Sequence, residues 1–259
     1  GADAVLLVGS NPRQEAPIIG HRIRQAWRKG AQVSAYNPLD WPLNFDTSLD
    51  AIDAPQRQVS SLAALAAAVE QKTAKAAPEG FRPLLDQARP GEAQQQLAER
   101  LQNAENGLVL FGQAAMSHPD AAWLRALASY IASASGCAFN VLTQGGNSKG
   151  AWLAGAVPHR GPGGSAATTG QNVIDMLASP LKSYILWGIE PGFDINNPSR
   201  AVKSIRAADN VIAVAAYASS GLREFADVIL PLSPQAESEG SMVKPGDVII
   251  RLIKEAPNP

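Results

Sequence analysis

The chain has 259 residues, with 22 Lys and Arg against 23 Asp and Glu, so its formal net charge is −1 at pH 7. A chain of this length can bury the core of one large or two medium domains. The two charge signs are balanced and no block of like charges occurs. The composition therefore argues against nucleic acid or an anionic membrane surface as the main partner.

Cysteine content and hydropathy exclude further classes of protein. The single cysteine, Cys137, excludes an internal disulfide framework and any iron–sulfur or zinc site held by several cysteines of this chain. No apolar run approaches the roughly 18 residues of a membrane-spanning helix, and no signal-peptide pattern opens the chain. We therefore expect a soluble segment of a longer polypeptide, attached to a membrane only through other proteins.

Predicted strands and helices alternate along the chain. Short apolar runs bounded by Gly, Pro or Asn predict strands at residues 5–8, 32–36, 107–111, 183–187, 210–214 and 228–231. Helical spacing or composition predicts helices at residues 17–29, 60–77, 92–104, 119–135 and 198–207. Such alternation predicts an α/β fold with mainly parallel sheets.

Three stretches lack this periodicity. Residues 39–58 predict a surface loop, residues 78–91 predict irregular structure, and residues 144–170 predict a long glycine-rich loop. Loops as long as the last are usually functional or disordered. We place the boundary between two α/β units near residue 105, which gives units over residues 1–104 and 105–243 and a strand-forming tail of unclear origin over residues 244–259.

An internal repeat supports two similar units. Residues 5–12 and 184–191 both consist of an apolar strand followed by Gly-x-x-Pro, and Gly9 and Gly188 lie 179 positions apart. At the same offset Val33 falls on Ile212 in the next strand. Chance can produce the Gly-x-x-Pro tetrads, since both residues mark turns. The agreement of the flanking strands favours a duplicated unit whose glycine turn faces a crevice.

The repeated turns contain the first candidate ligand-binding residues. Glycine at the end of a parallel strand lets the backbone approach a ligand, and the amides that follow can bind phosphate. Neither Gly9 nor Gly188 belongs to a Gly-x-Gly-x-x-Gly or P-loop motif, and turning the chain is the commoner use of such glycines. Asn11 and Glu190 occupy equivalent places, where either could bind a base or ribose or cap the turn.

Residues 145–150, Gly-Gly-Asn-Ser-Lys-Gly, offer flexible amides, an amide side chain and a cation. Such a stretch suits a pyrophosphate cradle, and it equally suits a solvated surface loop.

The remaining reactive side chains form no catalytic or metal-binding pattern. The three histidines, His21, His118 and His159, have no partner at metal-ligand spacing. Cys137 follows an expected helix end among apolar residues, which is typical of an inert buried thiol. Glu237 and Glu239 lack a partner acid or base, so turn and capping roles are favoured over catalysis. The residues themselves therefore predict neither a catalytic residue nor a metal site.

Three segments resemble the molybdopterin oxidoreductase superfamily. They are residues 5–33, which begin Val-Leu-Leu-Val-Gly-Ser-Asn-Pro, residues 145–158, which begin Gly-Gly-Asn-Ser-Lys-Gly-Ala-Trp, and residues 226–240, which begin Ala-Asp-Val-Ile-Leu-Pro. Within that superfamily the chain particularly resembles the large peripheral G subunits of bacterial NADH-quinone oxidoreductase, respiratory complex I. The similarity spans about residues 1–243, and three blocks in the right order are more specific than any one alone.

The resemblance implies two Rossmann-like, three-layer α/β/α units. In catalytic members these units hold the pterin dinucleotides of a molybdenum or tungsten cofactor. Carried over residue by residue, the positions along the cofactor crevice would be Gly9, Ser10, Asn11, Gly146, Asn147, Gly188 and Glu190. In complex I subunits the corresponding part has lost the cofactor, and iron–sulfur clusters are held by an amino-terminal cysteine-rich region that this chain lacks. We therefore expect a vestigial crevice and no cofactor in this segment.

Three functional hypotheses follow. The first is a structural, non-catalytic module that packs against other peripheral-arm subunits of complex I, on the cytoplasmic side of the bacterial inner membrane and without inserting into it. The second is a fragment of an active molybdenum or tungsten oxidoreductase of the formate dehydrogenase kind, which would bind molybdopterin guanine dinucleotide. Intact glycine turns favour it, and the missing metal-ligating residue disfavours it. The third is a nucleotide- or phosphate-binding module.

Overall fold

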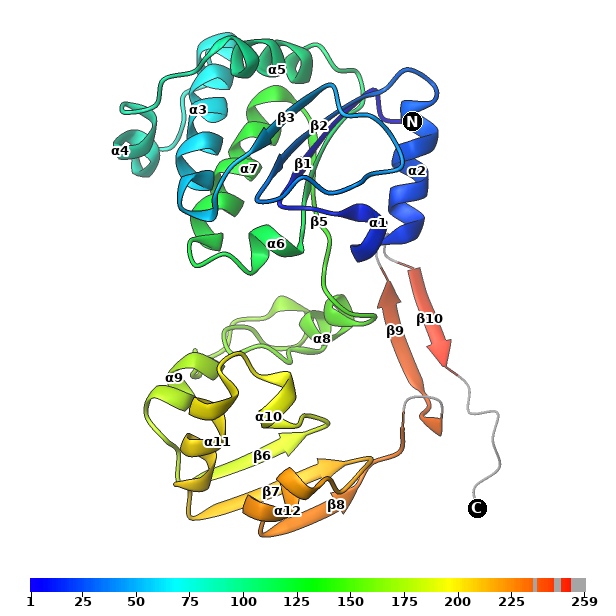
Figure 1. Cartoon of the computed structure of the whole chain (residues 1–259), viewed down its shortest axis with the longest axis vertical. Coiled ribbons are helices and arrows are strands. Elements are labelled where there is room, and N and C mark those ends of the chain that lie inside the picture. Colours follow the sequence, from blue (N-terminus) through cyan, green and yellow to red (C-terminus); the bar gives the residue numbers. More distant parts are fainter. Residues whose placement is uncertain (235–236, 245–247, 253–259) are drawn as a thin grey trace. The chain divides into compact units, whose positions relative to one another are not determined.

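The computed structural model describes residues 1–234, 237–244 and 248–252. The chain divides into two compact units, Gly1–Gln144 and Gly145–Pro259, and each contains its own parallel sheet (Figure 1). The predicted α/β class with mainly parallel sheets is thereby confirmed.

The sheet of unit 1 is built around its first strand. The strand order is β3 (Leu49–Ile52), β2 (Gln32–Asn37), β1 (Ala4–Val8), β4 (Gly107–Phe111) and β5 (Ala138–Val141), and all neighbours are parallel. Every residue of β1 is buried, as expected for a continuous apolar strand covered on both faces. The chain leaves β1 toward β2 and later returns to β4 on its other side. The carboxyl ends of β1 and β4 therefore meet where the strand order reverses.

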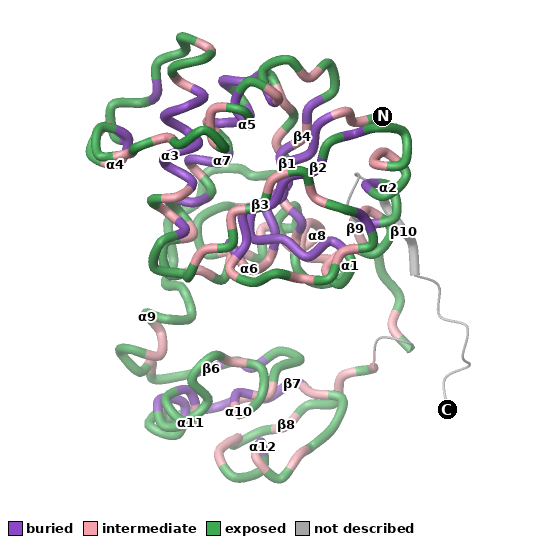
Figure 2. The backbone as a smooth tube through the Cα atoms, turned by 45° about the horizontal axis from the view of Figure 1, so that its top comes forward, coloured by how far each residue is buried: buried purple, intermediate pink, exposed green. Residues whose placement is uncertain are grey.

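Helices cover both faces of this sheet. On one face, α2 (Pro17–Trp27) packs its Ile23 against Val5 and Val33. On the other face lie three helices: α3 (Pro55–Thr73), α5 (Glu92–Gln102) and α7 (Ala121–Ser135). The buried strands form the interior of unit 1 (Figure 2). Unit 1 is thus the expected three-layer α/β/α arrangement.

The division between the units differs from the boundary near residue 105 that the sequence suggests. Strand β4 pairs with β1 from Ala4–Gly107 to Val8–Phe111, and β5 pairs with β4. All strands up to residue 141 therefore belong to unit 1. The physical reason is that a parallel partner is reached through a long crossover, so local patterning identifies a strand without identifying its neighbour.

Several short elements lie where the sequence predicts loops or gives no prediction. In unit 1 they are α1 (Pro12–Glu15), β3, η1 (Glu79–Phe81), α4 (Arg82–Leu85), α6 (Gln113–Met116) and β5, and α3 begins at Pro55 rather than near residue 60. In unit 2 they are α8 (Ser148–Ala154), η2 (Pro162–Gly164), α9 (Val173–Ala178), α10 (Pro191–Asp194) and α12 (Ser220–Phe225). Each has only three to seven residues, too few for a periodic pattern to emerge.

Unit 2 contains a three-stranded parallel sheet in the order β6 (Ser183–Trp187), β7 (Asn210–Ala215) and β8 (Val228–Pro231). The strands follow one another in chain order. Right-handed crossovers therefore place α11 (Pro198–Arg206) and α12 on the same face. Their Ile205 and Leu222 pack against Tyr184, Leu186 and Val211.

The opposite face of the unit 2 sheet is apolar and open. Exposed fractions reach 68% for Ile185, 67% for Trp187 and 47% for Leu230. The strand register aligns exposed Trp187 and Leu230 on either side of Val214 in one row across the sheet, and the central Val214 is itself buried. In the described part of unit 2, helices cover only one face of the sheet.

The end of the described chain forms an antiparallel pair, β9 (Gly240–Lys244) with β10 (Val248–Leu252). The strand expected in the tail over residues 244–259 is therefore present at residues 248–252. Residues 245–247 and 253–259 lie outside the described residues.

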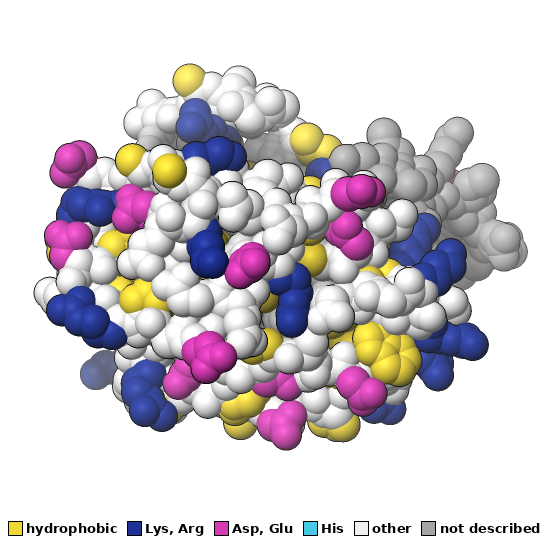
Figure 3. Space-filling view, turned by 90° about the horizontal axis from the view of Figure 1, so that it is seen from above, with side chains coloured by type: hydrophobic (Ala, Val, Ile, Leu, Met, Phe, Trp, Pro, Cys, Tyr) yellow, Lys and Arg dark blue, Asp and Glu magenta, His cyan; other side chains and the backbone are white. Residues whose placement is uncertain are grey.

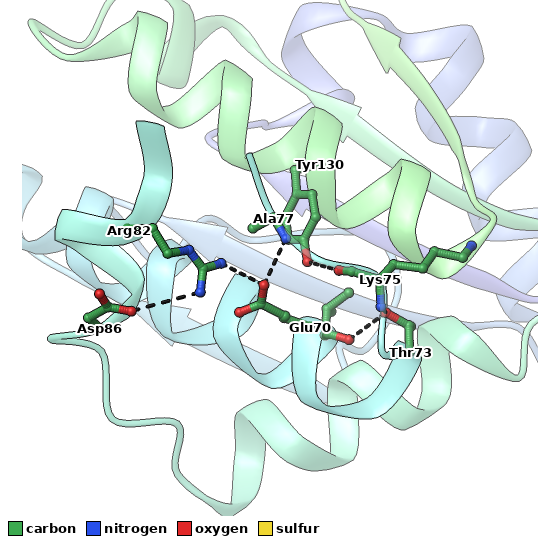
Figure 4. Close-up of polar contacts among 8 residues, drawn as sticks. Glu70, Thr73, Lys75, Ala77, Arg82, Asp86 and Tyr130 are labelled. Carbon is green, nitrogen blue, oxygen red and sulfur yellow. Dashed lines mark hydrogen bonds and ion pairs between the residues drawn. The ribbon is translucent and has the colours of Figure 1, made fainter. Parts of the chain in front are cut away.

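A polar cluster anchors the segment between α3 and α4 (Figure 4). Glu70 Oε1 accepts hydrogen bonds from the Ala77 amide at 2.7 Å and from Arg82 Nη2 at 2.5 Å, and Tyr130 donates its hydroxyl proton to the Lys75 carbonyl at 2.7 Å. Burial raises the pKa of the Glu70 carboxyl, but the two hydrogen bonds and the Arg82 charge outweigh burial and leave this pKa below its ordinary value.

We expect Glu70→Gln to lower the free energy of unfolding by about 1 kcal/mol at neutral pH. A carboxyl whose pKa is lower in the folded state stabilises the fold above its unfolded pKa of about 4.3, and this contribution is lost as pH falls through the folded pKa. The deficit of the variant, measured by urea denaturation, should therefore shrink in acid. Glu99→Gln is the control, because Glu99 pairs with Lys72 at the surface with 59% of its side chain exposed. An equal deficit at every pH would contradict the prediction.

Neighbouring residues of β6 test the open face of unit 2. Leu186→Ala should cost about 2–4 kcal/mol of stability, because Leu186 is 3% exposed in the core. Ile185→Ala should cost about 0.5 kcal/mol or less, because its side chain is largely solvated. Denaturant unfolding of the two variants measures both values. A similar loss for Ile185→Ala would mean that this face is covered.

Candidate functional site

The internal repeat is visible in three dimensions. Both copies consist of a strand, a glycine turn, a short helix, a longer helix and a parallel strand. The Gly9 amide donates to the Tyr36 carbonyl and the Gly188 amide to the Val214 carbonyl, each at 2.8 Å. Both glycines have positive φ, 54° and 63°, which favours glycine in each turn.

The structure corrects one residue match in the predicted alignment of the two repeat copies. Val5 pairs with Val33, and Tyr184 pairs with Val211. Val33 therefore corresponds to Val211 and not to Ile212, because the connection between the strands is one residue shorter in unit 2.

The Gly9 turn in unit 1 packs directly against the turn that follows β4. A Cβ atom added to Gly9 would lie 2.4 Å from the Ala115 amide nitrogen, and one added to Gly112 would lie 2.6 Å from the Gly9 carbonyl oxygen. The Gly9 carbonyl also accepts a hydrogen bond from the Ala114 amide at 3.0 Å. These glycines therefore serve a close approach of two backbone segments at the point where the strand order reverses.

Ser10 is held in this turn by Asn37 from the end of β2. The Ser10 amide donates to Asn37 Oδ1 at 2.9 Å, and Asn37 Nδ2 donates to the Ser10 carbonyl at 3.3 Å. Ser10 is 0% and Asn37 is 3% exposed, so each buried group has a partner, as buried polar groups require. Asn11 is also buried, and its Oδ1 has no hydrogen-bond partner among the described residues.

The carboxylate of Glu15 occupies the space where the two turns meet. Its Oε1 accepts from the Asn11 amide at 2.6 Å, and its Oε2 accepts from the Gln113 amide at 3.0 Å and from the Ser10 hydroxyl at 3.3 Å. Backbone amides after parallel strands are the groups that bind phosphate in dinucleotide-binding folds. In unit 1 the amides of Asn11 and Gln113 bind an anionic side chain of the same chain.

Unit 2 repeats part of this arrangement. Asp194 lies 179 positions after Glu15, and its Oδ2 accepts from the Glu190 amide at 2.6 Å. Glu190 is the counterpart of Asn11. An acid four residues after the turn position in both copies is a sequence signal that could have identified Glu15 and Asp194. No comparable local signal identifies Asn37 or Gln113, which join the site through tertiary structure.

A cavity of about 300 Å³ lies at the carboxyl ends of the unit 2 strands. Gly188, Glu190, Asp194 and Tyr217 contribute to its lining. The described residues that line this cavity include two carboxylates and no Lys, Arg or His. The structure thus places Gly188 and Glu190 together, in an acidic environment.

Gly146 and Asn147 are not among the described residues that line this cavity. Asn147 Oδ1 accepts from the Val243 amide at 2.8 Å, and its Nδ2 donates to the Ser241 carbonyl at 3.5 Å. A Cβ atom on Gly146 would lie 2.9 Å from Met242 Cε. The Asn147 hydrogen bonds therefore fasten the glycine-rich segment to β9, and Gly146 leaves room for the Met242 side chain.

The remaining candidates show no reactive geometry. The Sγ of half-buried Cys137 lies 3.5 Å from the Leu101 carbonyl, and burial raises the pKa of its thiol. Among the residues described here, no group of three or more His, Cys, Asp or Glu side chains could hold a metal ion. No helix within the described ranges is long and apolar enough to span a membrane.

A small cavity next to the Gly9 turn has a volume of about 10 Å³, which is room for about one water molecule. Tyr36 and Gln58 line it, and burial raises the pKa of the Tyr36 hydroxyl to about 12. This cavity cannot hold a nucleotide.

Comparison with known proteins identifies relatives over nearly the whole chain. The family model for molybdopterin oxidoreductase matches residues 1–254. The chain is 27% identical over 270 residues to the G subunit of NADH-quinone oxidoreductase from Streptomyces coelicolor, a match that covers 93% of this chain and 29% of that protein. This chain therefore spans less than a third of the length of that relative.

A solved structure has the same fold. It is the formyltransferase/hydrolase complex (FhcABCD) from Methylorubrum extorquens in complex with methylofuran. The match has a TM-score of 0.63 and 15% identity, and it covers 99% of this chain and 70% of that chain.

The close approach at Gly9 can be tested against another glycine with positive φ. Gly9→Ala should destabilise unit 1 more strongly than Gly30→Ala, because Gly30 has φ 98° and open space around its Cα, whereas a Gly9 Cβ meets Ala115. Both variants carry backbone strain of about 1–2 kcal/mol, and only Gly9→Ala adds a steric clash. Urea denaturation compares them, and equal losses would mean that α6 moves away freely.

Proposed function

Because this chain belongs to the molybdopterin oxidoreductase family, we propose that it is a structural module of the G subunit of an NADH-quinone oxidoreductase and has no catalytic activity of its own. In this role it supports electron transfer from NADH to quinone by packing against other peripheral-arm subunits of complex I. The complex would hold it peripherally on the cytoplasmic side of the bacterial inner membrane. The similarity to the Streptomyces protein over 93% of this chain supports this assignment.

The observation that carries the non-catalytic assignment is the position of Glu15. Its carboxylate already accepts the Asn11 and Gln113 amides at 2.6 and 3.0 Å. A pterin dinucleotide bound across this strand order would direct its diphosphate to such amides. A second anion at this position would be repelled by the Glu15 carboxylate, and the Asn11 and Gln113 amides would not be available to it because they already donate to Glu15. The residues of the unit 1 crevice therefore do not fit a diphosphate.

The unit 2 cavity leads to the same conclusion for a different reason. Glu190 and Asp194 are among its lining residues, and no cation is among those described. Protein sites for diphosphates combine backbone amides with Lys or Arg, because the ligand is strongly anionic. Here the Glu190 amide is engaged by Asp194 at 2.6 Å. We therefore assign no reaction step to a bound cofactor.

Removing the Glu15 carboxylate tests this proposal. Glu15→Ala leaves the Asn11 and Gln113 amides without their acceptor, which should lower stability by about 1–3 kcal/mol. Millimolar acetate should restore part of the loss, because a small carboxylate can replace the missing group and a ligand of the folded state raises the melting temperature. Thermal unfolding with and without acetate measures the rescue. Glu15→Gln, which keeps one acceptor oxygen, provides a second variant if Glu15→Ala does not fold.

Glu99→Ala is the matched control, because the Glu99 carboxylate pairs with Lys72 at the surface and not with backbone amides among the described residues. Acetate should therefore have no specific effect on this variant. The wild-type melting temperature should not rise with guanine nucleotides beyond the rise with equal orthophosphate. A larger rise would overturn the proposal in favour of a nucleotide-binding module. Molybdenum or tungsten at near one atom per full-length subunit would overturn it in favour of a formate dehydrogenase-like enzyme.

A further inference from the structure

A separate cavity in unit 1 is lined by two arginines and a histidine. It has a volume of about 100 Å³ and lies between α1, α2 and the loop after β2. Arg13, His21, Arg24 and Asn44 contribute its polar lining, and Phe45 contributes an apolar, buried surface. None of these residues takes part in the Gly9 turn or its hydrogen bonds to Glu15.

The helix geometry explains why these side chains converge. His21 and Arg24 are three residues apart on α2, so they share one face of the helix. Gly20 is buried between α1 and α2, where an added Cβ would lie 2.9 Å from the Pro12 carbonyl oxygen. This close packing places Arg13 of α1 beside the same face of α2. Arg13 Nη1 donates to the Pro42 carbonyl at 3.3 Å, which positions its guanidinium at the cavity and leaves other N–H donors available.

The charges of this cavity are unbalanced. Among the described residues, no carboxylate lines this cavity, and neither Arg13 nor Arg24 forms an ion pair. The nearby acid in the sequence, Glu15, is engaged by backbone amides. Arg13 and Arg24 are exposed, as are Arg22 on α2 and Arg28 and Lys29 just after its end. Figure 3 shows Lys and Arg side chains gathered over this edge of the molecule.

We propose that this cavity binds a compact oxyanion of the phosphate class through Arg13, Arg24 and His21. Guanidinium groups match phosphate oxygens with paired N–H donors, and a doubly charged tetrahedral anion can accept from several donors at once. A volume of about 100 Å³ lies below the 300–1,000 Å³ typical of sites that enclose a whole small-molecule ligand. The cavity therefore encloses the phosphoryl group alone, either of free orthophosphate or of a small phosphomonoester whose organic part remains in solvent.

Isothermal titration calorimetry of the whole chain with orthophosphate tests the proposal. Wild type should bind saturably, and Arg13→Gln and Arg24→Gln should each weaken binding about tenfold or more, because each removes charge-assisted hydrogen bonds. Arg22→Gln is the matched control: Arg22 lies on the same helix, is exposed and does not line the cavity. At physiological ionic strength, salt screens the charge of Arg22, so the affinity of the Arg22→Gln variant for orthophosphate should be nearly that of wild type.

A parallel titration with glycerol phosphate distinguishes the two sources, because the tighter ligand indicates whether the organic part contributes. Absence of saturable binding for both ligands would overturn the proposal. An equal loss in Arg22→Gln would also overturn it, because binding would then reflect only the general charge of α2. Arg13→Gln and Arg24→Gln should lose orthophosphate binding, whereas the acetate rescue of Glu15→Ala depends on the Asn11 and Gln113 amides. This inference and the proposed function therefore fail independently.

Discussion

The architecture of unit 1 depends on how the backbone amides at the end of its central strand are satisfied. Where β1 and β4 end side by side, the turns after them direct amides toward a common point, and a buried amide without an acceptor is costly. The Glu15 carboxylate supplies acceptors to both turns, at 2.6 Å from the Asn11 amide and 3.0 Å from the Gln113 amide. Gly9 and Gly112 permit this contact, because a side chain at either position would separate the turns.

This interaction links the fold to the proposed function. The same convergence of amides that binds a diphosphate in dinucleotide-binding folds is used here to join two segments of one chain. Asp194 contacts the Glu190 amide in the second copy of the repeat, so both copies place an acid on the amide of the turn. The acids thus support a structural use of the strand ends, and the cationic cavity along α2 is the place in unit 1 better suited to an anion.

Much of the fold follows from local sequence. The run Ala4–Val8 is continuously apolar and forms the buried central strand, and the α2 pattern yields a helix that begins at Pro17 as expected. The repeated glycine turns are also correctly located, since glycine favours the positive φ observed at Gly9 and Gly188. Local patterns do not predict short elements such as β3 and α4, because four residues contain too little periodicity. The acids Glu15 and Asp194 repeat at the offset of the glycine turns, but only their contacts with backbone amides reveal what they do.

The sequence by itself determined the α/β class, the positions of the main strands along the chain, the family resemblance and the two glycine turns, because each depends on residues close together in the chain. Tertiary structure alone decided that β4 joins β1, that Glu15 reaches Gln113 across 98 positions, and that Asn147 fastens β9. It also decided that the apolar residues of β6 divide between a covered and an open face. These outcomes depend on which segments meet after long crossovers, and local patterns do not record that choice.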